Sequence, residues 1–182
     1  MNEMLDELAI KLHGRPRKDR DGEYIVVSRE GGSVFQIEPF LRRVNESGQL
    51  VGADISFGYL PFSKLVNAIL GRKSTEFVSV LWQQSAKEIG PASPAIDALA
   101  ELLEPLLLEF EGEKESLIEV FRSNRPDMPS MAQVCHLAAL SWFGDIEKLE
   151  EYRQAFLIGD RMNFVPMISL EMIDRAIHAR PT

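Results

Sequence analysis

"LVGADISFGYLPFSKLVNAILG", residues 50–71, contains both kinds of hydrophobic periodicity found in this chain. In the first half, apolar residues alternate with polar residues or glycine, which is typical of a strand with one buried side. These apolar residues are Ala53, Ile55, Phe57 and Tyr59. In the second half, apolar residues recur three to four positions apart, as on one side of a helix: Phe62, Leu65, Val66 and Ile69. Gly71 then stands where a C-terminal cap glycine is common, so the stretch predicts a strand followed by a helix.

Two further strands are predicted before this stretch, at residues 24–28 and 33–41. The turn-rich spacers REGG and NESGQ separate the three runs, and short turns of this kind join antiparallel neighbours. Residues 75–84, TEFVSVLWQQ, are rich in β-branched and aromatic side chains and predict a fourth strand. Pro39 lacks the backbone N–H that a strand ladder needs, so we expect the second strand to end there or to lie at an edge.

The N-terminal segment combines a short helix with a basic turn. Residues 3–12 place apolar side chains every four positions, which predicts an amphipathic helix. Residues 13–23, HGRPRKDRDGE, contain two glycines and a proline, so we expect a loop there. Two interpretations of this local excess of positive charge stay open: a solvated connection, or a contact for an anion or an acidic partner.

The chain is predicted to be all-helical from residue 93 onward. Pro105 is expected to break or kink the first of these helices, and Gly112 to separate it from the next. Residues 134–143 are apolar in almost every direction around a helix axis, so that helix is predicted to be buried. Gly144 is expected to end it, and Asp145 to cap the helix that follows.

The predicted fold class is therefore α+β. It has an N-terminal helix and an antiparallel β-meander of three or four strands, followed by an all-helical C-terminal half. A chain of 182 residues is long enough for one domain with a real core. We expect residues 1–182 to form a single compact domain, in which the helical part, 93–182, packs on the part with the strands, 1–92.

No motif in the chain predicts a chemistry. Cys135 and His136 are adjacent, and neighbouring residues on a helix point about 100° apart, so they do not form a nucleophile and base. We expect Cys135 to pack in the core and His136 to make a structural hydrogen bond. The sequence contains no metal-ligand spacing and no phosphate-binding or nucleotide-binding glycine motif. We accordingly predict no catalytic, metal-binding or cofactor-binding residues, and a protein that is not an enzyme.

Charge and composition narrow the classes of partner. The net charge is −8 and the isoelectric point is about 5.0, a balance that phosphate backbones repel, so nucleic acid is not an expected partner. No apolar run approaches the length of a membrane span, and the first residues are an acidic amphipathic pattern, not that of a signal peptide. The single cysteine fits a reducing compartment, and we expect a cytoplasmic protein with no membrane association.

The main charge feature is an acidic segment at residues 101–119. It has seven glutamates against one lysine, Lys114: Glu101, Glu104, Glu109, Glu111, Glu113, Glu115 and Glu119. One interpretation is an ordinary solvated helix surface. The other is a docking surface for a basic protein, in which the first six of these glutamates take part together with Asp54 on the third strand.

Three stretches of the chain resemble a group of bacterial immunity proteins encoded beside secreted toxins in polymorphic-toxin and type VI secretion loci. They are HGRPRKDRDGEYIVV (13–27), FGYLP (57–61) and HLAALSWFGDIEKLEEYRQAF (136–156). The resemblance implies a protein that binds a cognate toxin in the producing cell and neutralises it without chemistry of its own. The third stretch is also similar to half of a tetratricopeptide hairpin, but no 34-residue period recurs in this sequence.

Two other classes stay open from the residues alone. Type III secretion chaperones are also small, acidic α+β proteins, which typically dimerise and hold an extended segment of an effector. An enzyme of another kind would require a cluster of polar side chains in a pocket. Oligomeric state, and whether the partner stays folded when bound, distinguish the immunity protein from the chaperone.

Overall fold

The computed structural model of the chain describes residues 3–20, 22–43, 49–73, 80–90, 92–123 and 131–180. It separates into two compact units. Unit 1 consists of Met1–Gly58 and Val80–Glu113, and unit 2 of Tyr59–Ser79 and Lys114–Thr182. Each unit therefore draws on both sides of residue 92, and the expectation of a single compact domain stays a prediction.

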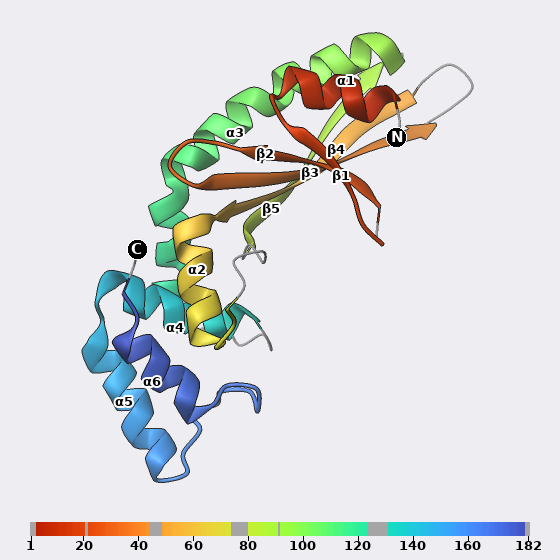
Figure 1. Cartoon of the computed structure of the whole chain (residues 1–182). Helices are drawn as coiled ribbons and strands as arrows, with labels where there is room; N and C mark the ends of the chain where they lie inside the picture. Colours follow the sequence, from red (N-terminus) through yellow and green to blue (C-terminus); the bar gives the residue numbers. More distant parts are fainter. Residues whose placement is uncertain are drawn as a thin grey trace. The chain divides into compact units, whose positions relative to one another are not determined.

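The α+β class is confirmed, with a helix and an antiparallel sheet followed by helices (Figure 1). Unit 1 contains α1 (Glu3–Lys11), the sheet and the first part of α3 (Ala92–Ser123). The strands follow one another across the sheet in the order in which they occur in the chain: β1 (Arg15–Lys18), β2 (Glu23–Ser28), β3 (Ser33–Arg43), β4 (Gln49–Tyr59) and β5 (Val80–Gly90).

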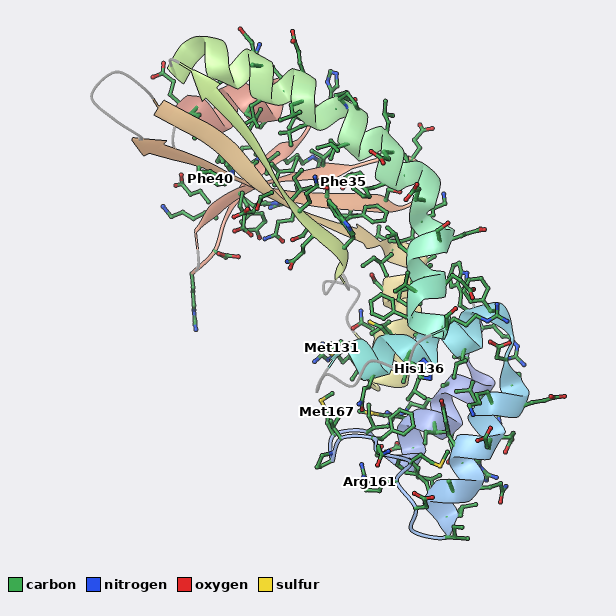
Figure 2. All side chains as sticks on the ribbon, turned by 180° about the vertical axis from the view of Figure 1, so that it is seen from behind. Phe35, Phe40, Met131, His136, Arg161 and Met167 are labelled. Carbon is green, nitrogen blue, oxygen red and sulfur yellow. The ribbon has the colours of Figure 1, made fainter. Side chains whose placement is uncertain are left out.

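The period-two pattern of the strands gives the sheet one apolar side. The side chains on that side are almost fully buried: Ile25, Val27, Phe35, Ile37, Ala53, Ile55 and Phe57. The helix α3 covers them, because the Phe110 ring stacks on Trp82 with 3.8 Å between centroids and lies 6.3 Å from Phe57. Phe35 belongs to this core, whereas Phe40, five residues along the same strand, is on the opposite side of the sheet (Figure 2).

The strand β1 corrects the expectation of a loop at residues 13–23. Arg15–Lys18 pair with β2 through a tight turn, in which the Asp19 N–H donates to the Gly22 carbonyl at 2.9 Å. The Asp19–Gly22 pair is hydrogen-bonded, and hydrogen-bonded and non-hydrogen-bonded pairs alternate along the ladder, so Pro16 and Ile25 form a non-hydrogen-bonded pair. The Pro16 nitrogen therefore faces the free edge of the sheet. The proline and glycines of this segment are turn signals, which favour a loop, but at an edge this proline costs no ladder hydrogen bond.

The connection from α1 to β1 is held by a Schellman turn. The Gly14 N–H donates to the Ala9 carbonyl at 2.8 Å, and the His13 N–H to the Ile10 carbonyl at 3.2 Å. His13 takes the left-handed conformation, with φ of +53°. Gly14 packs against β2 so closely that an added Cβ would lie 2.5 Å from Cγ2 of Ile25.

Two expectations about strand ends were wrong. Pro39 neither ends β3 nor marks an edge, because β3 continues to Arg43 and lies between β2 and β4. The register of β3 with β2 extends to the Ile25–Ile37 pair, and Pro39 lies beyond it. The predicted fourth strand is β5, which runs to Gly90, while residues 75–79 of that prediction lie outside the described residues.

The helix α3 is continuous over 32 residues, so it neither breaks at Pro105 nor is divided at Gly112, and both of these expectations were wrong; the alternative of a kink at Pro105 stays a prediction. Pro105 is exposed and costs one backbone hydrogen bond, while Gly112 has open space where a Cβ would be. Burial of the apolar side of the helix outweighs these two local costs. The buried side chains along it are Ile96, Leu99, Leu103, Leu107, Phe110 and Ile118.

Unit 2 is helical and is built around α4 (Met131–Phe143), as the all-round apolar pattern predicts. Every residue from Gln133 to Ser141 is buried, because α4 contacts α2 (Leu60–Ile69), α5 (Ile146–Leu157) and α6 (Leu170–His178). Gly144 follows with φ of +79°, which confirms the predicted end of the helix. Asp145 does precede α5, but its side chain makes no cap hydrogen bond and instead accepts two from Arg122.

The segment between α5 and α6 is fixed by two polar side chains. The Arg161 guanidinium donates to the carbonyls of Val165 and Ile168, both at 2.7 Å, and lies over the Phe156 ring. The buried Gln133 accepts a hydrogen bond from the Val165 N–H at 3.0 Å. These bonds give hydrogen-bond partners to two backbone carbonyls and one N–H that lie outside the helices.

We expect Gly14→Ala to lower the free energy of unfolding by about 1–3 kcal/mol, because its Cβ would collide with the buried Ile25. The matched control is Gly112→Ala, where the Cβ enters open space within a helix, and we expect it to raise stability by about 0.5–1 kcal/mol. Urea unfolding of the two variants beside the parent chain checks this. Equal effects in the two variants would contradict the close contact between the α1–β1 connection and β2.

Candidate functional site

The acidic segment lies on α3, and the structure divides its carboxylates into paired and unpaired groups. Glu104 accepts a hydrogen bond from Arg29 at 2.7 Å, and Glu119 forms an ion pair with Arg122 at 3.2 Å. Hydrogen bonds to the carboxylates of Asp145 and Glu119 raise the pKa of Arg122 above its ordinary value. Because Glu104 and Glu119 neutralise cations of their own unit, they contribute little charge toward a partner.

The carboxylates of the remaining glutamates have no ion pair or hydrogen bond with any residue that the structure describes. These glutamates are Glu101, Glu109, Glu111, Glu113 and Glu115. An α-helix turns by about 100° per residue, so Glu101, Glu109 and Glu113 lie within roughly 120° of one another around α3. That arc points away from the buried Leu103 and Leu107. These three carboxylates are exposed and belong to unit 1.

Two exposed leucines lie at this surface of α3. Leu102, which is 37% exposed, lies within the arc, and Leu108, which is 58% exposed, lies about 20° beyond its edge on the side of Glu101. We call Glu101, Leu102, Leu108, Glu109 and Glu113 the acidic face of α3. Apolar side chains surrounded by charged ones are a common arrangement at protein–protein interfaces.

Asp54 is not part of the acidic face. It lies on β4 between Ala53 and Ile55, whose side chains point into the core, so its own side chain is on the opposite side of the sheet from α3. The Ser85 hydroxyl of the neighbouring strand donates a hydrogen bond to its carboxylate. A shallow hollow of about 450 Å³ surrounds it, lined by Glu38, Asp54, Ile55, Ser56, Gln83, Gln84 and Ser85. Of the predicted partner-binding residues, the structure brings together Glu101, Glu109 and Glu113. Glu104 is paired with Arg29, Glu111 and Glu115 point in other directions around α3, and Asp54 lies on the other side of the sheet.

Cys135 and His136 have the roles that the sequence predicts for them. The His136 Nδ1 donates to the Phe121 carbonyl at 2.6 Å, which leaves Nε2 to accept from the Tyr152 hydroxyl at 3.1 Å (Figure 2). Burial raises the pKa of the Cys135 thiol to about 12. A protonated, buried thiol is a poor nucleophile, so the pair stabilises the core of unit 2.

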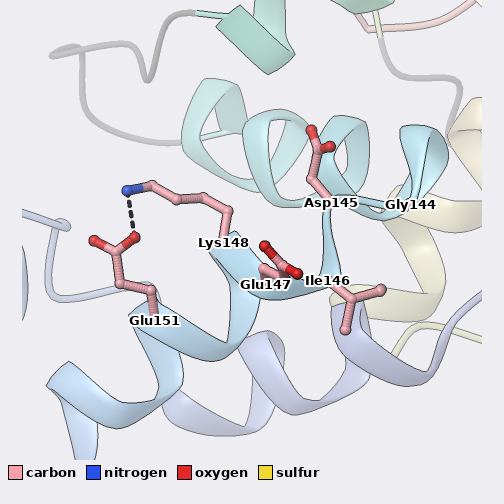
Figure 3. Close-up of a pocket in the computed structure, with 6 residues that line it drawn as sticks. All are labelled: Gly144, Asp145, Ile146, Glu147, Lys148 and Glu151. Atoms are coloured by element: carbon pink, nitrogen blue, oxygen red, sulfur yellow. Dashed lines mark hydrogen bonds and ion pairs between the residues drawn. The ribbon is translucent and has the colours of Figure 1, made fainter.

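A hollow of unit 2, of about 600 Å³, is at the turn between α4 and α5 (Figure 3). It is lined by Gly144, Asp145, Ile146, Glu147, Lys148 and Glu151. Lys148 is paired with Glu151 at 2.7 Å, and the Asp145 carboxylate is held by Arg122. Its charged groups are thus mostly engaged with each other, and nothing in the hollow combines a nucleophile with a base.

A second group of charges, which the sequence marks only as a basic turn, becomes a defined cluster in the structure. A hollow of about 310 Å³ is lined by His13, Arg15, Arg17, Val26 and Ser28. The sequence signal was the run of basic residues, but the strand that places Arg15 and Arg17 on one side of the sheet was not predicted.

No group of three or more His, Cys, Asp or Glu side chains in the described part of the chain is placed to hold a metal ion. None of the described helices is both long enough and apolar enough to cross a membrane.

Residues 2–180 match a family of unknown function (DUF6990), and the chain therefore belongs to that family. No curated protein matches the chain, and no solved structure matches it.

The burial of Cys135 predicts a thiol that does not react in the folded chain. A pKa of about 12 against an ordinary 9.0 lowers the thiolate fraction at pH 8 by a factor on the order of 1,000. We expect labelling by a disulfide reagent to be slower by at least that factor in the native chain than in the chain unfolded in guanidinium chloride. Rapid stoichiometric labelling of the native chain would show instead that Cys135 is accessible.

Proposed function

We propose that this member of DUF6990 is a binding protein without chemistry of its own, which captures a basic secreted toxin in the cytoplasm of the producing cell and neutralises it. The observation that carries the proposal is the acidic face of α3. It combines unpaired carboxylates with two exposed leucines on one side of a rigid helix. The leucines give this acidic surface apolar area that a partner can bury.

The arrangement supports both parts of a protein–protein contact. The carboxylates attract a positively charged partner and raise the rate of encounter, while the leucines supply apolar area that is buried only in the complex. Glu101 to Glu113 span about 18 Å of helix, which is shorter than an interface of standard size requires. The helix α1, joined to α3 by the Lys11–Asp97 ion pair at 2.6 Å, carries an Ile10 that is 75% exposed and extends the apolar surface of unit 1.

The identity of the partner rests on the resemblance to immunity proteins of toxin loci. A basic toxin, such as a nuclease, binds phosphates through lysine and arginine side chains, and a row of carboxylates on a helix offers those side chains an alternative anionic surface. On this proposal the complex blocks the toxin by occupying its substrate surface, and no residue of the chain reacts.

The direct test is co-purification of the tagged chain from its native cell with the neighbouring open reading frames expressed. We expect one basic toxin domain to coelute and to lose its toxicity in the complex. If no protein coelutes even at low salt, the proposal fails. A dimer of the chain that holds an unfolded effector segment would identify a secretion chaperone, and size-exclusion chromatography with protease protection of the partner distinguishes that result.

The triple variant Glu101→Lys, Glu109→Lys, Glu113→Lys tests the acidic face. Each change adds two units of charge, so three raise the net charge from −8 to −2. We expect the dissociation constant of the toxin complex to rise by about tenfold or more, mainly through slower association, because like charges then face each other. Surface plasmon resonance at two salt concentrations measures both rates.

The matched control is Glu30→Lys, Glu147→Lys, Gln154→Lys, Ile158→Lys. These four side chains are also exposed and have no ion pair or hydrogen bond among the described residues, and together they change the net charge by the same six units. The control should change association only slightly. Equal losses in both variants would mean that net charge, and not the acidic face, governs binding.

A further inference from the structure

The hollow between β1 and β2 brings four polar side chains to one place on the side of the sheet that α3 does not cover. Arg15 and Arg17 are two positions apart on β1 and so point to the same side, opposite Val26 and Tyr24 of β2. Ser28, two residues after Val26, continues that side, and His13 precedes the strand. The volume of about 310 Å³ is at the lower end of the range for small-molecule sites.

The polar side chains at this hollow are unengaged, whereas two lysines nearby are paired. Lys18 pairs with Glu23 at 3.0 Å, and Lys11 pairs with Asp97 at 2.6 Å. In the described part of the chain, the side chains of His13, Arg15 and Arg17 have neither a hydrogen bond nor an ion pair. Lys18 and Glu23 form the pair next to Arg17 and Tyr24, and side chains of successive pairs point to opposite sides of the sheet. The Glu23 carboxylate therefore lies on the other side of the sheet from Arg15 and Arg17.

His13 supplies an independent indication. It occupies the position of a Schellman turn where glycine is usual, and its φ of +53° costs a residue with a side chain about 1 kcal/mol or more. Glycine would fit this turn with less strain, yet the chain has an imidazole there, and that imidazole lines the hollow. Residues with a strained backbone cluster at functional sites. A strained histidine beside two guanidinium groups without ion pairs therefore favours a binding site over a simple connection between α1 and β1.

We propose that this hollow binds the phosphate group of a small phosphate monoester. Two guanidinium groups match the charge of a monoester, which is about −1.5 to −2 at neutral pH, and each offers a planar pair of N–H donors to two phosphate oxygens. The Ser28 hydroxyl and the His13 imidazole supply further donors, and Val26 offers an apolar contact for the organic part of the ligand. A polyanion is disfavoured, because the net charge is −8 and Glu38 is on the same side of the sheet two strands away.

This site does not depend on the proposed toxin binding. It lies on the side of the sheet opposite to α3, so a phosphate ester and a partner on the acidic face of α3 occupy different surfaces of unit 1. The binding test below needs no toxin, and either proposal can fail while the other stands.

The test is a titration of the full chain with inorganic phosphate and with phenyl phosphate at constant ionic strength. The readout is the change in backbone amide chemical shifts, measured by NMR at each ligand concentration. We expect saturable shifts at residues 13–17 and 24–28, with a dissociation constant of millimolar or below for phenyl phosphate. Sodium chloride and sodium acetate serve as reference anions. Saturation by acetate with equal affinity, or shifts that grow linearly for every anion, would overturn the proposal.

Three variants separate binding from folding. Arg15→Gln with Arg17→Gln should weaken phenyl phosphate binding at least tenfold, whereas Lys64→Gln with Lys73→Gln, an equal change of charge at exposed positions of unit 2, should leave it unchanged. His13→Gly should weaken binding severalfold and yet keep or raise the melting temperature, since glycine relieves the strained turn. An unchanged affinity in His13→Gly and in the double arginine variant would show that the hollow is not the site.

Discussion

The contact of Phe110 with Phe57 and Trp82 decides how unit 1 is arranged. The stacked rings, with centroids 3.8 Å apart for Phe110 and Trp82, join α3 to the apolar side of the sheet. Once that side of the helix is buried, the opposite side must face water, and so must the other side of the sheet. Both candidate binding surfaces of unit 1 are consequences of this single layer of apolar packing.

The two surfaces of unit 1 have opposite charge and different character. On α3, carboxylates surround leucines along a convex helix, which suits a protein partner with a complementary surface. Between β1 and β2, two arginines converge on a small hollow, which suits a small anion. The sheet and its core lie between the two surfaces, so they face in opposite directions.

Unit 2 uses its charges differently. Arg122 is held by Asp145 and Glu119, and Arg153 by Asp174 at 2.7 Å, so its prominent cations are engaged within the unit. Its central helix buries His136 with both ring nitrogens bonded and Cys135 in apolar surroundings. Such satisfied polar groups specify how the helices of unit 2 pack against one another.

The α+β class, the buried helix α4 and its end at Gly144 could be predicted from the sequence, because they depend on local periodicity and on the backbone freedom of one glycine. Both charged segments, on α3 and before β2, could be located in the same way. That residues 15–18 form an edge strand and that α3 continues through Pro105 depends on long-range packing, since burial against the sheet outweighs local turn and breaker signals. The tertiary structure also decides which glutamates are unpaired, because Glu104 is neutralised by Arg29, 75 positions away in the chain. Contacts of that kind form between segments whose proximity no local pattern contains.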